Sequence, residues 1–128
     1  MKDLIVHDPD FSLNDVHLMK IGRHFRFSPK LRLVVGRNED ENQKIQTFSK
    51  EADILLKICD HPGPLSLLRG DASLEEIDKA GAITVRYSKA KDSGKVEVDY
   101  RKAGEKTHQS ISVSPISEEQ IRNLLVGE

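Results

Sequence analysis

Hydrophobic and polar residues alternate on both sides of a short turn at residues 28–30, Ser-Pro-Lys. Phe25 and Phe27 precede the turn with Arg26 between them. Apolar residues follow it at 31, 33 and 35, with Arg32 after the first of them. A period of two is typical of a strand with one face toward the core and one toward water. Two such strands around a turn with proline predict a β-hairpin. We expect it to bury its apolar side chains and to expose a row of Arg and Lys.

Four later segments predict further strands. The continuous apolar run within 52–59 favours a central strand buried on both faces. The stiff segment 60–64, Asp-His-Pro-Gly-Pro, must interrupt it, so the strand at 65–69 would complete a second hairpin. Residues 95–101 alternate cleanly, and a last strand is expected around 109–113.

Helix-capping patterns predict the remaining elements. Asn38 opens the segment 38–49 and is followed three residues later by a glutamate, which resembles a capping box. The segment 73–88 begins with Ser-Leu-Glu-Glu, a clear capping box. Shorter helices are expected after Asn14, ending near Gly22, and after Ser117.

These elements predict an α+β domain: a mixed or antiparallel sheet of about six strands, with two to four helices packed mainly on one side. The length of 128 residues suits one domain with its own core. We expect residues 23–128 to form this domain. Residues 1–22, with their short helix, would be a linker to an upstream domain.

The charge pattern changes the picture, because no acidic residue occurs between Lys20 and Asn38. This stretch carries Arg23, Arg26, Arg32 and Arg37, and His24 could join them. The net charge of the chain is only −1, so an anionic partner must be bound by a local patch. A solvated strand face and an anion-binding surface, most plausibly for a phosphodiester backbone, are both open readings of this stretch.

Cationic groups near the ends of other elements could join Arg37 at one edge of the sheet. They are Lys89, Lys91, Arg101 and Lys102. Arginine can hold a phosphate with two hydrogen bonds and can also stack on a base. Tyr87 could offer a stacking surface or could belong to the core.

The sequence offers little for catalysis, and we expect none. The five histidines are scattered without metal-ligand spacing, so neither a metal site nor a cofactor is predicted. Asp60-His61 is the best acid–base pair, but a loop of this kind more often has only a turn-forming role. Phosphate binding by His61, or by backbone donors near Gly63, is favoured over proton transfer. Cys59 lies beside an apolar run and predicts a structural thiol. Without a membrane span or a secretory signal, a cytoplasmic location is expected.

The order of several short motifs resembles the NFACT-R domain. The motifs are Val-Val-Gly-Arg-Asn at 34–38, Glu-Asn at 41–42, Ala-Asp-Ile at 52–54, Pro-Gly at 62–63, Arg-Tyr-Ser-Lys at 86–89 and Val-Glu-Val-Asp-Tyr at 96–100. The resemblance covers about residues 25 to 115. The shared positions are Gly36, Arg37, Asn38, Asn42, Asp53, Gly63, Tyr87 and Ser88. Where family members of ribosome quality-control factors have Trp-Phe-His and Pro-Gly-Ser-His, this chain has Leu-Leu-Lys at 55–57 and Pro-Gly-Pro-Leu at 62–65.

The resemblance implies an RNA-binding domain. The stretch 18–28 looks more like the divergent form found at the C-terminus of PP-loop proteins that resemble tRNA thiouridylases. It thus implies a non-catalytic accessory domain of a tRNA sulfur-modification protein, with tRNA or another structured RNA as ligand. A PP-loop ATPase domain would lie upstream in the same or a partner chain. The alternative is a protein-interaction module that packs against such a domain.

Overall fold

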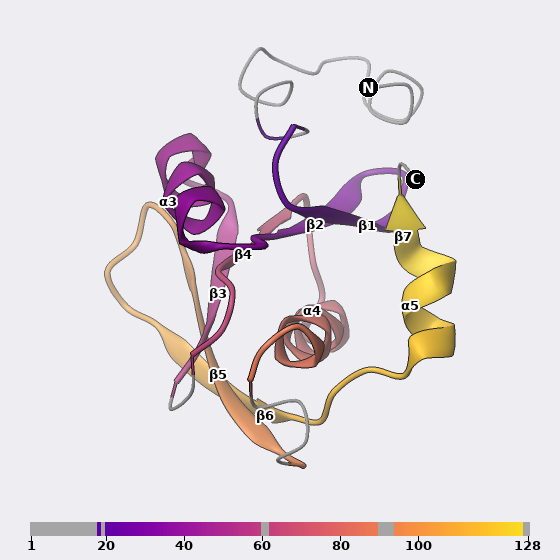
Figure 1. The fold of residues 1–128 in the computed structure, drawn as a ribbon. Coiled ribbons are helices and arrows are strands. Elements are labelled where there is room, and N and C mark those ends of the chain that lie inside the picture. The colour runs from indigo at the N-terminus through magenta and orange to yellow at the C-terminus, as the bar shows by residue number, and fades with distance from the viewer. Residues whose placement is uncertain (1–17, 19, 60–61, 90–93, 127–128) are drawn as a thin grey trace.

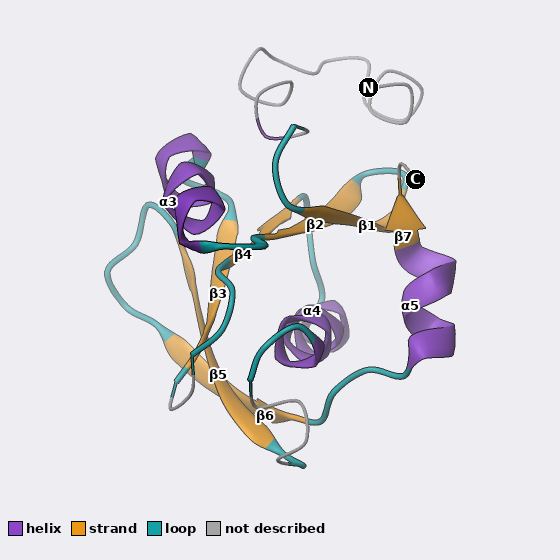
Figure 2. Cartoon of the chain, viewed as in Figure 1, coloured by secondary structure: helices purple, strands orange, loops and turns teal. Residues whose placement is uncertain are grey.

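The computed structural model describes residues 18, 20–59, 62–89 and 94–126. In this part the chain forms one antiparallel sheet and three helices, an α+β fold as predicted (Figure 2). The strands are β1 (Arg23–Ser28), β2 (Leu31–Val35), β3 (Ile54–Ile58), β4 (Ser66–Arg69), β5 (Val96–Lys102), β6 (Gln109–Val113) and the two-residue β7 (Leu125–Val126). The helices are α3 (Glu39–Phe48), α4 (Leu74–Arg86) and α5 (Glu118–Leu124).

The sheet has the strand order β6-β5-β3-β4-β2-β1-β7, and every neighbouring pair is antiparallel. Both predicted hairpins are present: β1 pairs with β2 around the turn at Pro29, and β3 pairs with β4. β2 and β3 therefore lie inside the sheet, with a neighbour on each side.

The sheet curves around α4, which lies in its concave face, and α5 closes the open side (Figure 1). A large apolar cluster fills this face; it includes Phe25 and Leu56 from the sheet, Ile83 from α4 and Ile121 from α5. A Cβ atom at Gly81 would lie 3.1 Å from Ile111 Cδ1, so α4 sits very close to β6.

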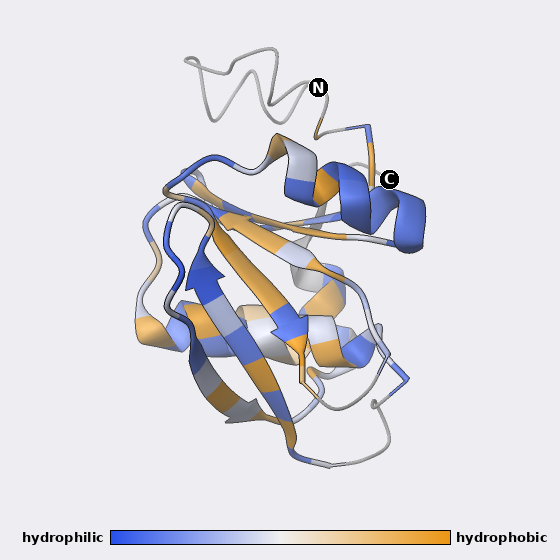
Figure 3. Cartoon of the chain, turned by 90° about the vertical axis from the view of Figure 1, so that its left-hand side faces the viewer, coloured by the Kyte–Doolittle hydropathy of each residue, from blue (hydrophilic) through white to orange (hydrophobic). Residues whose placement is uncertain are grey.

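α3 covers the opposite, convex face of the sheet. Ile45 of this helix joins a smaller cluster with Val34, Leu55 and Leu67 of the sheet. Figure 3, which looks onto this side, shows α3 as a mostly hydrophilic helix. Two of the three described helices thus share one face, as the sequence predicted, and α3 alone lies on the other.

The helix caps form largely as expected. The Ser73 hydroxyl accepts a hydrogen bond from Glu76 N at 3.2 Å, and Glu76 Oε1 accepts one from Ser73 N at 2.9 Å. Asn38 caps α3 through Oδ1, which accepts from Glu41 N at 2.9 Å. The predicted second half of that box does not form, because the Glu41 carboxylate binds Arg37 instead.

The expected row of exposed cations on the first hairpin was wrong for Arg32. All five residues of β2 are buried, and Arg32 is 6% exposed. The physical reason is the position of β2 between β1 and β4, with apolar residues covering both of its faces. Because apolar residues cover both faces of β2, the alternation in its sequence does not predict exposure.

Two further sequence expectations concern the ends of the chain. The short helix predicted after Asn14 lies outside the described residues. The predicted C-terminal helix is present as α5, but it stops at Leu124, and Leu125 enters β7 opposite Phe25. None of the helices in the described segments is long and apolar enough to cross a membrane.

Candidate functional site

Three segments that are distant in the sequence meet at one end of the sheet. They are the loop after β2 (36–38), the loop before β4 (62–65) and the end of α4 (87–89). Gly36 N donates to Leu65 O at 3.0 Å, and Lys89 N donates to Pro62 O at 3.2 Å. Around them lies a hollow of about 360 Å³, which we call the α3–α4 hollow. It is lined by Arg23, Gly36, Arg37, Asn38, Glu39, Asn42, Pro62, Gly63, Pro64, Tyr87, Ser88 and Lys89.

Two glycines allow these segments to approach. A Cβ atom at Gly36 would overlap with Asn42 Oδ1, and one at Gly63 would lie 2.9 Å from both Ile58 Cγ1 and Ser88 Cβ. Asn42 Oδ1 in turn accepts a hydrogen bond from Leu65 N at 3.0 Å. Gly36 and Asn42 therefore join the first two loops.

Glu41 fixes the position of Arg37. Its Oε1 accepts from Arg37 N at 3.0 Å and from Arg37 Nε at 2.9 Å, and its Oε2 accepts from Arg37 Nη2 at 2.7 Å. The hydrogen bonds from Arg37 lower the pKa of Glu41 to about 2, and the same contacts raise the pKa of Arg37. The Arg37 side chain is still 50% exposed, so an oriented guanidinium stands at the rim of the hollow.

Arg23 and Tyr87 form the opposite rim. The Arg23 guanidinium lies over the Tyr87 ring, 4.5 Å from its centroid, and the ring also packs on Phe25 at 5.9 Å. Tyr87 thus packs against the core, one of the two roles considered for it, and its ring also supports a cation. The outer face of a supported guanidinium can stack on a planar group.

The remaining predicted residues of the hollow divide by accessibility. Lys89 is exposed and adds a third cation. Ser88 is buried, and its hydroxyl donates to Val85 O at 2.7 Å, so it shapes the end of α4. Asn38 and Asn42 hold the loops, as described above. His24 adds no charge at neutral pH, because burial lowers the pKa of its imidazole.

Five predicted site residues lie elsewhere or outside the described chain. Arg26 donates to Ser28 O and Pro29 O at the end of the first hairpin. Arg32 is buried on the convex face, opposite Arg69 of β4. Arg101 and Lys102 are neighbours on β5, so their side chains leave opposite faces of the sheet. His61 and its neighbour Asp60 are not among the described residues.

One accessible cation was missed as a site residue. Lys57 stands within the apolar run of β3 and is exposed on the convex face. The sequence did contain an indication of it, because a single lysine in an otherwise apolar strand indicates a side chain that reaches solvent. In the described segments, no group of three or more His, Cys, Asp or Glu could hold a metal ion.

The sequence is similar to a protein family and to a curated protein. A family model described as "NFACT protein RNA binding domain" matches residues 22–125. The curated protein "Rqc2 homolog RqcH" of Bacillus subtilis (strain 168) is 38% identical over 74 residues, which make up 56% of this chain and 13% of that protein.

A solved structure supports the fold. The C-terminal part of the fibronectin/fibrinogen-binding protein from Streptococcus suis aligns with a TM-score of 0.73 at 19% identity. The alignment covers 98% of this chain and 58% of that chain. The chain therefore spans only a fraction of the length of both relatives.

Proposed function

Because the chain belongs to the family of NFACT protein RNA-binding domains, we propose that it binds RNA through the α3–α4 hollow and has no chemistry of its own. The observation that carries this proposal is the convergence of Arg23, Arg37 and Lys89 on one hollow. Each cation comes from a different element, so only the folded domain brings them together. With a net charge of −1, the chain must rely on such a local cluster to attract phosphates.

The geometry favours recognition of RNA shape. Arg37 is held by Glu41 and can offer its free N–H groups to a phosphate or a 2′-hydroxyl group without a large loss of side-chain entropy. Arg23, supported by Tyr87, can stack on a base or pair with a phosphate. Such contacts orient an RNA and discriminate poorly between sequences.

The finer proposal is that the RNA is tRNA and that the domain serves a sulfur-modification protein with an upstream PP-loop domain. It rests on the resemblance of residues 18–28 alone, and neither relative reported above is named as a thiouridylase. Our proposal of a sulfur-modification protein with an upstream PP-loop domain therefore has only this stretch as its support. Binding of tRNA by this chain can be tested directly.

The test is a salt titration of binding to bulk tRNA and to a DNA duplex of matching length. We expect tighter binding to tRNA and a steep loss of affinity with salt. Lys89→Ala should weaken binding at low salt and lower the salt slope by about one, as expected for one lost phosphate contact. Arg23→Ala should weaken binding as well, because it removes the guanidinium that the Tyr87 ring supports.

Lys79→Ala is the matched control, because it removes the same charge from the exposed side of α4, near Phe27 and outside the hollow. Equal effects of Lys79→Ala and Lys89→Ala would mean that only overall charge matters and would refute the hollow as the site. Absence of tRNA binding at low salt would refute RNA binding and favour the alternative, a protein-interaction module.

A further inference from the structure

The α3–α4 hollow continues along the convex face between α3 and β3. A second hollow of about 220 Å³ shares Glu39, Asn42, Gly63 and Pro64 with the first. A third, of about 230 Å³, shares Gln46, Lys57 and Leu65 with the second and reaches Arg101. Because neighbouring hollows share lining residues, they lie next to one another along this face. We call the second and third hollows together the α3–β3 groove.

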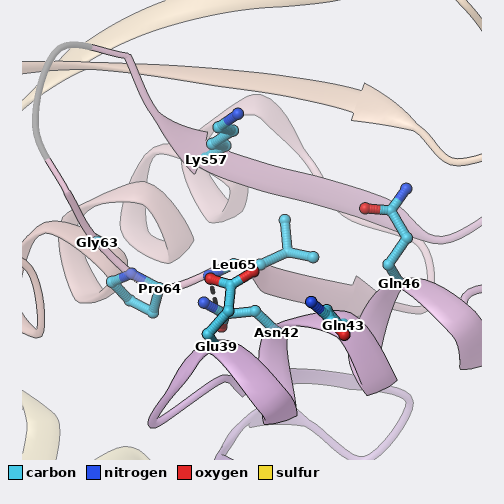
Figure 4. A pocket seen from close by; sticks show the side chains of 8 residues that line it. All are labelled: Glu39, Asn42, Gln43, Gln46, Lys57, Gly63, Pro64 and Leu65. Carbon is cyan, nitrogen blue, oxygen red and sulfur yellow. Dashed lines mark hydrogen bonds between the residues drawn. The ribbon is translucent and has the colours of Figure 1, made fainter.

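Side-chain amides line one wall of this groove. Gln43 and Gln46 stand three residues apart on α3, hence on one face of the helix. Figure 4 shows both side chains on the groove side of α3, with Lys57 of β3 across from them. Both glutamines are exposed, and within the described chain neither amide group has a hydrogen-bond partner. Two free amides offer both donors and acceptors.

The floor and the near end of the groove have a different chemistry. Pro64 and the half-buried Leu65 give an apolar floor. Glu39 stands where the groove meets the α3–α4 hollow, and its carboxylate would repel a phosphate at that point. A carboxylate accepts hydrogen bonds from base amino groups, such as N4 of cytosine. The interior of the groove therefore suits bases, while Arg37 and Lys89 of the α3–α4 hollow suit phosphates. At the far end Arg101 stands beside Asp99, and its Nη1 already donates to backbone carbonyls of the loop after β5.

Bases can reach such amides only when they are unpaired. In an A-form duplex the major groove is too deep and narrow for side chains to read, and base edges are recognised mainly in loops, bulges and ends. We propose that the α3–β3 groove binds a short unpaired RNA segment and that Gln43 and Gln46 hydrogen-bond its base edges. This inference rests on the proposed function and specifies the class of RNA.

The amides predict a preference for unpaired bases as a class. An amide can form two hydrogen bonds with adenine, through N6 and N7, and two with an unpaired uracil, through N3–H and O4. We therefore expect single-stranded oligo(A) and oligo(U) both to bind more tightly than a duplex of the same length. Phosphate contacts at Arg37 and Lys89 would be common to all three.

The experiment measures the affinity of the 128-residue chain, by fluorescence anisotropy, for four labelled probes: single-stranded oligo(A), single-stranded oligo(U), a blunt RNA duplex and bulk tRNA. We expect both single strands to bind about tenfold more tightly than the duplex, because only they expose their base edges to the amides. Gln43→Ala with Gln46→Ala should abolish this preference for unpaired bases and leave the salt slope unchanged, since no charge is removed.

Thr47→Ala is the matched control: it changes an exposed polar residue of the same helix that does not line the groove. It should leave the preference for unpaired bases intact. RNA binding with equal affinity for all probes, or an unchanged preference in the double variant, would overturn this inference and leave the proposed function standing. No binding to any of the RNA probes, tRNA included, would overturn both.

Discussion

At the level of single residues, Glu41 decides how the rim of the α3–α4 hollow is built. Its side chain is only 9% exposed, and all three of its hydrogen bonds from Arg37 hold the loop after β2 against the start of α3. A carboxylate at this position also complements the positive end of the helix dipole. One acidic residue thus orients the arginine that we propose to contact RNA.

This arrangement predicts a pH dependence of stability. The pKa of Glu41 is about 2 in the folded chain and ordinarily 4.5. As the pH falls from about 4.5 toward 2, the unfolded chain takes up the proton first, so the stability contributed by the ionised group is lost. Glu41→Gln should cost about 1–3 kcal/mol of unfolding free energy at pH 7 and much less at pH 2.

Urea unfolding of both chains at several pH values measures this difference. Glu39→Gln serves as a control, since Glu39 is an exposed acidic residue in the same helical turn. A cost of Glu41→Gln that stays constant from pH 7 to pH 2 would contradict the assigned role.

At the level of elements, α4 connects the concave core with the candidate site. Its apolar residues pack inside the curved sheet, and its last turn carries Tyr87 and Lys89 to the hollow. The start of the helix is fixed by the Ser73 capping box at the far end. The position of the site therefore depends on a helix that is anchored at both ends.

The cap gives a second stability prediction. Ser73→Ala removes the hydrogen bond to Glu76 N and should lower the unfolding free energy by about 1 kcal/mol. RNA binding should be preserved, because the change lies at the opposite end of α4 from the hollow. Ser114→Ala, at an exposed loop position, should change neither property. Urea unfolding and tRNA titration of the two variants test both statements, and a loss of affinity in folded Ser73→Ala would contradict them.

At the scale of the whole molecule, a buried ion pair links the two layers on the convex face. Arg69 of β4 binds Asp53, which precedes β3, through Nε–Oδ1 at 2.9 Å and Nη2–Oδ2 at 2.6 Å. Arg69 Nη2 also donates to Phe48 O at the end of α3. The side chain of Arg69 is 12% exposed and that of Asp53 is 4% exposed. The pair thus holds α3, β3 and β4 together, and the groove lies between these elements.

Removing one partner should be more harmful than removing both. Asp53→Ala leaves Arg69 buried without its carboxylate and should cost about 3–5 kcal/mol. Exchange of both residues for apolar ones, as in Asp53→Leu with Arg69→Met, should cost clearly less. Thermal or urea unfolding of the single and double variants tests this. A double variant that is less stable than the single one would contradict the prediction.

Much of the fold follows from local patterns. The alternation around the Ser-Pro turn, the capping boxes and the break at 60–64 correctly predicted both hairpins and the helices α3, α4 and α5. The strand β7 was not predicted, and its first residue was assigned to the C-terminal helix. A strand of two residues is too short to show an alternating pattern, and its partner β1 lies near the other end of the sequence. The burial of Arg32 was missed because alternation does not reveal whether other residues cover both faces of a strand.

The candidate site divides in the same way. The sequence by itself determined that a strand ends and a helix begins at Gly36, Arg37 and Asn38. It also determined that a second helix ends at residues 87–89. These are local facts of turn, cap and charge. Only the tertiary structure decided that both places share a hollow with the loop at 62–65, and that Gln43 and Lys57 face each other across a groove. The physical reason is that strand order and helix placement depend on pairing between distant segments, which no local pattern specifies.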